Sequence, residues 1–353
     1  MIKFDYQALP WNIIFGPGTL QRLPDEVSKL GYSRALVLCT PNQKDQGQDI
    51  ADLLGPLAVG LFDQAQMHVP AGTLAHAIQE VTALRADCTV SIGGGSTTGL
   101  GKALALKLGL PNIVIPTSYA GSEMTNIWGI TENDRKVTGR DISVVPTLTI
   151  YDPELTLTLP PEFAGPSGMN AMAQAVVNVA SGSINPIVQL MALEAVRSLA
   201  HSLPKVIAEP DNMAARAEAL YGACLAGGSL GTGTTSLHHR LCHTFGGTFN
   251  TPHAETHTIL LPHCVAYNAE ATAEGTRKLA EAMGVDNAAV GIFKLAKTLG
   301  APTALKDIGI LEADLDKAAA AATETPVNNP EPVTQERVRA LLQRAWAGDE
   351  PRA

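Results

Sequence analysis

Short apolar runs alternate with longer segments of helical hydrophobic spacing between Arg34 and Tyr151. Such alternation is typical of βαβ units, in which a helix follows each strand. Runs that are largely apolar along their whole length fit strands covered on both faces, as the strands of a parallel sheet are. We therefore expect an α/β domain with a parallel sheet over residues 1–160. The clearest predicted strands are Ala35–Cys39, Cys88–Ile92 and Asn112–Ile115.

The pattern changes after Leu159, where alanine-rich segments carry apolar residues three and four positions apart. This spacing predicts amphipathic helices, so we expect an all-α domain over residues 161–353. The last residues, Asp349–Ala353, are expected to form a frayed tail. The predicted helices are Asn170–Ala180, Val188–Leu203, Ala214–Leu225, Ala280–Leu299, Glu312–Thr323 and Val333–Ala347.

Composition narrows the class of protein. A chain of 353 residues that is 45% hydrophobic and 17% charged can bury the cores of two globular domains. Its net charge of −9 argues against binding nucleic acid or an anionic membrane, because both require a basic surface. The five cysteines are scattered singly, which indicates reduced thiols, and Met1–Tyr6 lacks the pattern of a secretory signal. We expect a cytoplasmic enzyme.

A glycine-rich turn follows the predicted strand Cys88–Ile92. Gly93, Gly94 and Gly95 lead through Ser96 and Thr97 into a helical pattern. Backbone N–H groups at a helix N-terminus bind phosphate, and glycine lets the backbone approach it closely. The turn therefore predicts a pyrophosphate site, although the same residues also fit an ordinary tight connection.

A second polar loop follows the next predicted strand and contains Thr117, Ser118 and Tyr119. Loops at the carboxyl ends of adjacent parallel strands form a ligand crevice, so we expect a dinucleotide there. The strand Ala35–Cys39 leads to Thr40 and Asn42, without a carboxylate to hold the ribose 2′-hydroxyl of the adenosine. We expect NADH as the coenzyme, with NADPH also accepted.

Six of the nine histidines fall within 26 residues of one another, at positions 238, 239, 243, 253, 257 and 263. On a helix His239 and His243 share a face, and a break at Gly246–Gly247 is expected to fold His253 back toward them. A metal site and an acid–base site are both open interpretations. For His238, His257 and His263, a structural role is an equal alternative.

Several motifs together resemble the iron-containing alcohol dehydrogenase superfamily, and most closely its maleylacetate reductase branch. The resemblance covers nearly the whole chain, and it implies a Rossmann-like parallel sheet followed by an all-α domain, in a homodimer. The motifs are Phe15–Leu20, Tyr119–Thr125, Trp128–Thr131, Gly168–Ala173 and His238–His263.

The resemblance also implies where a metal would bind. Metal-dependent members use an aspartate, a histidine four residues later and two further histidines, which correspond here to Asn170, Gln174, His239 and His253. Two neutral amides remove the anionic ligand and one strong nitrogen donor, so we expect no metal. Gln174 also departs from the histidine of the maleylacetate reductase branch.

Further roles are implied by the resemblance alone. Gly94, Gly95 and Ser96 would hold the pyrophosphate, Thr117 and Ser118 the adenine and phosphates, and Lys136 the nicotinamide ribose. Without the resemblance, Lys136 and Arg140 would be assigned to a solvated, charged loop.

Loss of the metal ligands favours reduction of a carbon–carbon double bond conjugated to a carbonyl, since the charge spreads into an enolate. The implied reaction is reduction of maleylacetate, a dicarboxylate, to 3-oxoadipate. We expect His243 to donate the proton, with His253 as the second candidate. The alternatives are a metal-dependent alcohol or polyol dehydrogenase and a non-catalytic dinucleotide sensor. The expected substrate-binding residues are Tyr119, Asn170, Gln174, His238, His239, Arg240 and His257.

Overall fold

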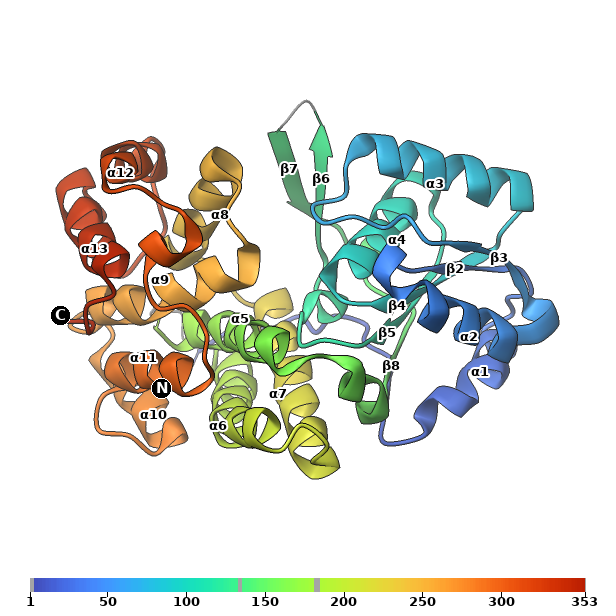
Figure 1. Ribbon diagram of the computed structural model, residues 1–353, viewed down its shortest axis with the longest axis horizontal. Helices are drawn as coiled ribbons and strands as arrows, with labels where there is room; N and C mark the ends of the chain where they lie inside the picture. Colours follow the sequence, from blue (N-terminus) through green and yellow to red (C-terminus); the bar gives the residue numbers. More distant parts are fainter. Residues whose placement is uncertain (1–2, 133–134, 181–184, 353) are drawn as a thin grey trace. The chain divides into compact units, whose positions relative to one another are not determined.

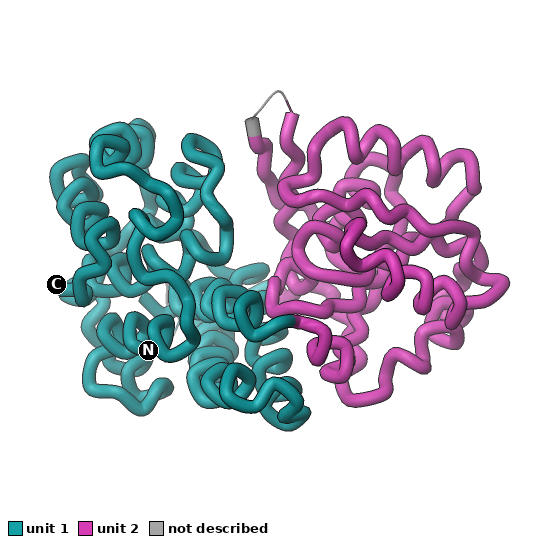
Figure 2. The backbone as a smooth tube through the Cα atoms, in the orientation of Figure 1, with its two compact units in different colours: residues 1–7, 160–353 teal, residues 8–159 magenta. Residues whose placement is uncertain are grey.

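The computed structural model describes residues 3–132, 135–180 and 185–352. The chain forms two compact units (Figure 2). The α/β unit is Ala8–Leu159, and the helical unit is Pro160–Ala353 together with Met1–Gln7. The first residues were expected in the α/β domain. They group instead with the helical unit, where the side-chain amide of Asn185 donates a hydrogen bond of 3.1 Å to the carbonyl of Asp5.

The α/β unit contains a six-stranded parallel sheet in the order β1-β8-β5-β4-β2-β3 (Figure 1). The predicted strands are confirmed as β2, β4 and β5, whereas β1 lies before the stretch in which strands were expected. The strands are β1 Ile13–Phe15, β2 Ala35–Leu38, β3 Ala58–Phe62, β4 Cys88–Gly93, β5 Asn112–Pro116 and β8 Leu148–Tyr151.

Helices cover both faces of this sheet, which explains why its central strands are apolar along their length. In β2, Ala35 and Val37 pack with α1 and α2 on one face. Leu36 and Leu38 pack with α3 and α4 on the other. The helices are α1 Leu23–Lys29, α2 Lys44–Leu54, α3 Ala71–Leu84 and α4 Gly95–Leu108.

An antiparallel pair of strands, β6 Ile127–Glu132 and β7 Arg135–Arg140, also belongs to the α/β unit. The expectation of a charged loop around Lys136 and Arg140 is therefore wrong. Both residues are exposed, but they lie in a strand whose backbone pairs with β6. The segment Arg135–Arg140 contains three charged residues, and its composition alone did not distinguish a solvated strand from a loop.

The helical unit has no strand among its described residues, as expected. One hydrophobic core joins α8, α9, α12 and α13, with Leu237, Phe245 and Leu341 fully buried in it. No described helix combines the length and apolarity that crossing a bilayer requires. The helices are α5 Pro161–Ala180, α6 Pro186–Ala208, α7 Met213–Thr232, α8 Leu237–Phe249, α9 His253–Asn268, α10 Ala273–Met283, α11 Ala288–Thr298, α12 Leu315–Thr323 and α13 Gln335–Ala347.

Local chemistry corrects two expected boundaries. The predicted helix Ala280–Leu299 is divided into α10 and α11, because Gly284 adopts a left-handed conformation at φ 68° and Asn287 caps the next helix. The predicted break at Gly246–Gly247 is absent, since α8 continues to Phe249 and ends at left-handed Asn250.

The expected frayed tail is also wrong where the structure describes it. Asp349 donates a backbone hydrogen bond of 3.1 Å to Arg344, and Pro351 is buried. Ala353 lies outside the described residues.

Candidate active site

Three loops meet at the carboxyl edge of the parallel sheet. We call them the strand-end loops: Thr40–Gln43 after β2, Gly93–Ser96 after β4, and Thr117–Ser122 after β5. In the strand order, β3 follows β2 toward one edge of the sheet, whereas β5 follows β4 toward the opposite edge. A sheet reverses its winding between two such strands, and the crevice formed there is the usual ligand site of open α/β folds.

Two glycines of the turn, Gly93 and Gly94, leave little room for a side chain. A Cβ on Gly93, whose φ is 140°, would lie 2.6 Å from Oε1 of Gln43, and one on Gly94 would lie 2.8 Å from Oγ of Ser118. The helix α4 begins at Gly95, and its N-terminus has no side-chain cap. Uncapped N–H groups of a helix are suited to an anion such as pyrophosphate, and no acidic residue in the first turn opposes it.

A glutamine that sequence reasoning left without a role joins the three strand-end loops. Gln43 Nε2 donates to Oγ1 of Thr117 at 3.0 Å, and Gln43 Oε1 accepts from Oγ1 of Thr40 at 3.1 Å. The backbone N–H of Thr117 in turn donates to the carbonyl of Gly93 at 3.0 Å. The structure thus brings together Thr40, Gly93 and Thr117. Asn42 is exposed and makes none of these hydrogen bonds.

A buried lysine on α4 holds the third loop and was not predicted. Lys102 Nζ donates to the carbonyls of Ser122 at 2.6 Å and Ile127 at 2.9 Å, and to Oγ1 of Thr125 at 2.9 Å. Burial lowers the pKa of Lys102 to about 7. In the sequence, Lys102 stands out only as a lysine among the apolar and small residues of a helix. A lysine in such a position is usually buried with its charge satisfied by hydrogen bonds.

A buried acid directly follows the same loop. Glu123 accepts a hydrogen bond of 2.8 Å from the hydroxyl of Tyr151, and burial raises the pKa of the Glu123 carboxyl. Tyr119, expected at the substrate, is 0% exposed.

Lys136, expected near the nicotinamide ribose, is exposed on β7. Its Nζ lies 3.2 Å from Nδ1 of His68. Burial, and then the charge of Lys136, lower the pKa of His68, so its ring accepts a hydrogen bond from the lysine. His68 has a positive φ of 65°, and sequence reasoning had assigned it no role.

The second region lies in the helical unit, where α8 packs against α9 (Figure 1). Four imidazoles form what we call the histidine cluster: His238, His239, His253 and His257. The centroid of the His257 ring lies 4.8 Å from that of His238, 5.3 Å from that of His239 and 4.4 Å from that of His253. His239 and His253, which were expected to approach one another, thus both lie beside His257, and the turn at Asn250 reverses the chain between the two helices.

Two of the six clustered histidines lie apart from this centre. His243 is exposed, and its ring centroid is 6.5 Å from that of His239, on the same face of α8 as expected. His263 is buried six residues after His257 on α9, where its ring centroid lies 6.4 Å from that of Phe293. His263 is therefore part of the packing of the helical unit.

Burial corrects the expected charge of the histidine cluster. Burial lowers the pKa of His238 to about 4. Burial, and then the neighbouring histidines, lower the pKa of His257 well below its usual value. Both rings are neutral near pH 7, so they bring no positive charge to a bound substrate. Arg240 is partly buried and donates to Oγ1 of Thr325 at 2.9 Å.

The hydrogen bonds of the histidine cluster identify one tautomer. Nε2 of His238 lies 3.2 Å from the carbonyl oxygen of His257, and since a carbonyl only accepts, Nε2 carries the hydrogen. Nδ1 of His238 is then a bare acceptor. This Nδ1 and both ring nitrogens of His257 are buried without a hydrogen-bond partner among the described residues.

Two amides lie on a helix beside these residues. Asn170 and Gln174 are four residues apart on α5, so they share a face, and they are only 8% and 6% exposed. The helix α5 packs against α9, which carries His253 and His257. The expected neighbours of the histidines are therefore on an adjoining helix of the same unit.

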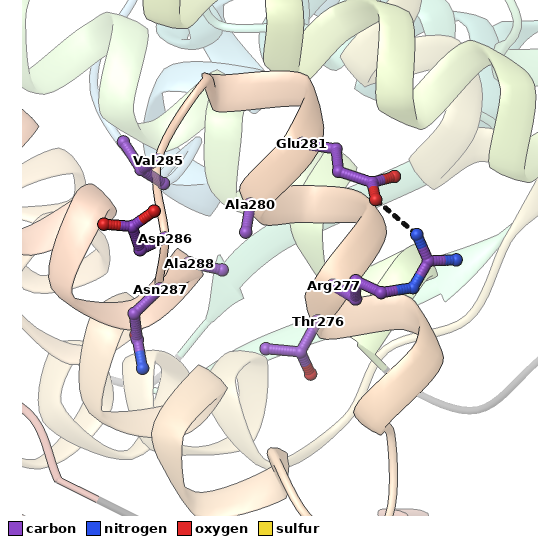
Figure 3. Close-up of a pocket in the computed structure, with 8 residues that line it drawn as sticks. All are labelled: Thr276, Arg277, Ala280, Glu281, Val285, Asp286, Asn287 and Ala288. Carbon is purple, nitrogen blue, oxygen red and sulfur yellow. Dashed lines mark hydrogen bonds and ion pairs between the residues drawn. The ribbon is translucent and has the colours of Figure 1, made fainter.

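A separate surface hollow of about 290 Å³ lies between α10 and α11 (Figure 3). It is lined by the ion pair of Arg277 with Glu281 and by small side chains such as Ala280 and Ala288. None of the expected site residues contributes to it.

Comparison with protein families divides the chain as the structure does. Residues 10–153 match the family described as iron-containing alcohol dehydrogenase, and residues 165–346 match the C-terminal domain of the Fe-containing alcohol dehydrogenase family.

Individual relatives match over the full length. Maleylacetate reductase of Sphingobium indicum is 50% identical over 350 residues, which cover 99% of each chain. The crystal structure of maleylacetate reductase from Agrobacterium tumefaciens has a TM-score of 0.96 and 47% identity, covering 99% of this chain and 100% of that one. Sulfoacetaldehyde reductase from Bifidobacterium kashiwanohense, solved in complex with NAD⁺, has a TM-score of 0.90 at 23% identity, covering 99% and 100% of the two chains, and shows a shared fold.

Proposed function

Because the chain belongs to the iron-containing alcohol dehydrogenase family and is an oxidoreductase, we propose that it is a maleylacetate reductase. In this proposal it uses NADH to reduce the carbon–carbon double bond of maleylacetate and releases 3-oxoadipate. The observation that carries the proposal is the 50% identity over 99% of both chains to a relative of that name.

The strand-end loops are the proposed coenzyme site. Gly94, Gly95 and Ser96 present the uncapped N-terminus of α4 to the pyrophosphate, and the absence of a Cβ on the two glycines allows close approach. Thr117 and Ser118 contribute hydroxyls beside it. Since Thr40 stands where a carboxylate would repel a 2′-phosphate, we propose that NADPH is accepted as well as NADH.

The residues at the family's metal position do not fit a catalytic iron. Asn170 and Gln174 are neutral amides, which supply no anionic ligand and no imidazole nitrogen, although His239 and His253 remain. We therefore propose a reaction that needs no metal. Hydride addition to an enone suits this donor set, because the developing charge is delocalised rather than concentrated on one alkoxide oxygen.

The proposed reaction balances in two steps. Hydride passes from NADH to the β-carbon of the enone, and the π electrons move to the carbonyl oxygen as an enolate. A general acid then protonates the α-carbon, which restores the carbonyl and leaves NAD⁺ and the saturated product. His243 suits this acid because its exposed ring exchanges protons with water, and partly buried His253 is the second candidate.

Few residues of the proposed site can supply positive charge to the carboxylates of the substrate. His238 and His257 are neutral and can only donate or accept hydrogen bonds. We propose that Arg240 supplies positive charge, while Asn170, Gln174 and His239 offer neutral donors to the substrate oxygens.

The test is the oxidation of NADH, followed at 340 nm, with maleylacetate compared with simple aldehydes and polyols. We expect turnover of maleylacetate that is unchanged by chelator, with 3-oxoadipate identified by mass spectrometry. Metal-dependent turnover of alcohols would support an alcohol or polyol dehydrogenase instead. NADH binding without turnover of any of these compounds would favour a sensor.

A further inference from the structure

The N-terminus of α8 is buried and lacks the partners that the start of a helix usually has. The first N–H groups of an α-helix have no acceptor within the helix, so a side chain, water or a ligand must satisfy them. Ser236, Leu237 and His238 are only 7%, 0% and 2% exposed, which leaves little access for water. No described residue accepts a hydrogen bond from the backbone N–H of Leu237 or His238.

The residue at the N-cap of α8 does not cap the helix. A serine in this position normally accepts a hydrogen bond from one of the first N–H groups. Ser236 makes no such bond, and its hydroxyl has no hydrogen-bond partner among the residues that the structure describes, although the residue is more than nine-tenths buried. By contrast, the side chains of Asn185, Asn212 and Asn287 cap α6, α7 and α11. The N-terminus of α8 therefore stays open beside an unused, buried hydroxyl.

A second unused hydroxyl lies two residues earlier, in a loop that is held in place. Oγ1 of Thr234 is buried and has no hydrogen-bond partner in the described part of the chain. The backbone N–H of Thr234 donates to Oδ1 of Asn178 at 3.0 Å, and a Cβ on Gly233 would collide with that same oxygen. Asn178 is 3% exposed and lies on α5, four residues after Gln174. The loop is thus fixed to the face of α5 that carries the two amides.

These features together have the chemistry of an anion site. Unpaired N–H groups at a helix N-terminus carry partial positive charge, and hydroxyl groups donate further hydrogen bonds. The first turn of α8 contains no acidic residue, and the residues before it, Gly231–Ser236, are all glycine, threonine or serine. Buried polar atoms in proteins almost always have a partner, so atoms without one indicate a ligand. The donors here fit a small oxyanion.

We infer that the N-terminus of α8 binds one carboxylate of a dicarboxylate substrate, with the hydroxyls of Ser236 and Thr234 donating to its oxygens. The identity of that substrate rests on the proposed function. Because His238 is neutral, the helix N-terminus supplies positive potential that the imidazoles do not. His239 follows in the first turn of α8, so the remainder of a substrate bound here can reach the histidine cluster.

The experiment is calorimetric titration of the protein with adipate, an unreactive saturated dicarboxylate, in the presence of NADH. We expect adipate to bind and to compete with maleylacetate. Ser236→Asp should weaken adipate binding more than about 100-fold, because the new carboxylate caps α8 and repels the ligand. The same cap should raise the unfolding temperature, which verifies that the variant is folded. The matched control is Asn287→Asp, which adds a carboxylate at the N-cap of α11 and should bind adipate as wild type.

A second pair of variants removes a hydroxyl without adding charge. Thr234→Val should weaken adipate binding about tenfold and raise KM for maleylacetate by a similar factor with kcat unchanged, since a hydrogen bond to a charged group is lost. The control is Thr232→Val, because the hydroxyl of Thr232 already donates to the carbonyl of Gly228 at 3.0 Å. This control should leave both quantities unchanged.

Wild-type adipate affinity in Thr234→Val or in a folded Ser236→Asp variant would overturn the inference, and so would the absence of adipate binding to the wild-type protein. If Ser236→Asp does not fold, the two threonine variants decide. Unchanged reduction of maleylacetate by the Ser236 and Thr234 variants would reject the anion site and leave the proposed function intact. Adipate binding that both variants lose, in a protein that does not reduce maleylacetate, would establish the site and reject the proposed function.

Discussion

The strand-end loops and the histidine cluster present ligands with different kinds of surface. In the α/β unit the surface is mainly backbone and small hydroxyl side chains, held by hydrogen bonds from Gln43 and Lys102 that leave little freedom. In the helical unit it is a group of large side chains from α8 and α9, some of whose buried nitrogens have no partner among the described residues.

This difference shows two ways of preparing a site. A backbone surface with its supporting contacts satisfied is already shaped for a ligand that many proteins share, such as a dinucleotide. A cluster of neutral, partly unsatisfied side chains is instead adapted to a particular small molecule or ion, and its properties depend on each residue. The predictions below separate the two regions by their effects on coenzyme affinity, turnover and stability.

The largest expected effect is in the helical unit. His243→Ala should lower turnover by about 100-fold or more, which is the usual contribution of a general acid, while NADH affinity stays within about twofold. The measurements are kcat with maleylacetate and fluorescence titration with NADH. Wild-type turnover would reject the role of His243, and the same loss in His253→Ala alone would assign it to His253.

The reverse pattern is expected for the glycine turn. Gly94→Ala should weaken NADH binding by about tenfold, because the new Cβ meets Ser118 Oγ and stands against the pyrophosphate. Gly72→Ala on α3 is the control, since a Cβ there has nothing within 4 Å. If NADH affinity is unchanged in Gly94→Ala, the pyrophosphate does not lie on this turn.

The buried lysine predicts a dependence of stability on pH. Its pKa is about 7 when folded and about 10.5 when unfolded, so between these values the unfolded chain binds the proton that the folded chain has released. The free energy of unfolding should therefore rise with pH from 7 to 10, by about 1 kcal/mol per pH unit. Lys102→Met should remove this slope.

The control for this slope is Lys107→Met, which changes an exposed lysine of the same helix. Denaturant unfolding at several pH values measures each variant. An equal slope in wild type and Lys102→Met would show that Lys102 keeps its proton throughout this range.

The smallest expected effect tests how the strand-end loops are joined. Gln43→Leu removes the hydrogen bonds to Thr40 and Thr117, each worth about 1 kcal/mol, and should raise KM for NADH about fivefold with kcat unchanged. Gln48→Leu on α2, the helix that follows Gln43, removes only an exposed contact with Asp52 and serves as control. An equal KM in both variants would mean that the loops keep their arrangement without Gln43.

The sequence was most informative where local patterns repeat. Apolar strands such as Cys88–Ile92, the glycine turn after them and the alanine-rich helices after Pro160 each follow from neighbours in the chain, and each was found. Boundaries were less accurate. At Gly284 and Asn250 the chain ends a helix through a single left-handed residue, whereas the glycine pair at 246–247, which predicts such an end, lies within a helix.

By itself, the sequence determined the order of the elements, the glycine turn at the end of β4 and the concentration of histidines on α8 and α9. Tertiary structure decided which of those side chains are charged and which meet. Burial makes His238 and His257 neutral, and packing of α8 against α9 places His257 beside both His239 and His253. Both outcomes depend on desolvation and on contacts between residues distant in the chain, which no local pattern of residues encodes.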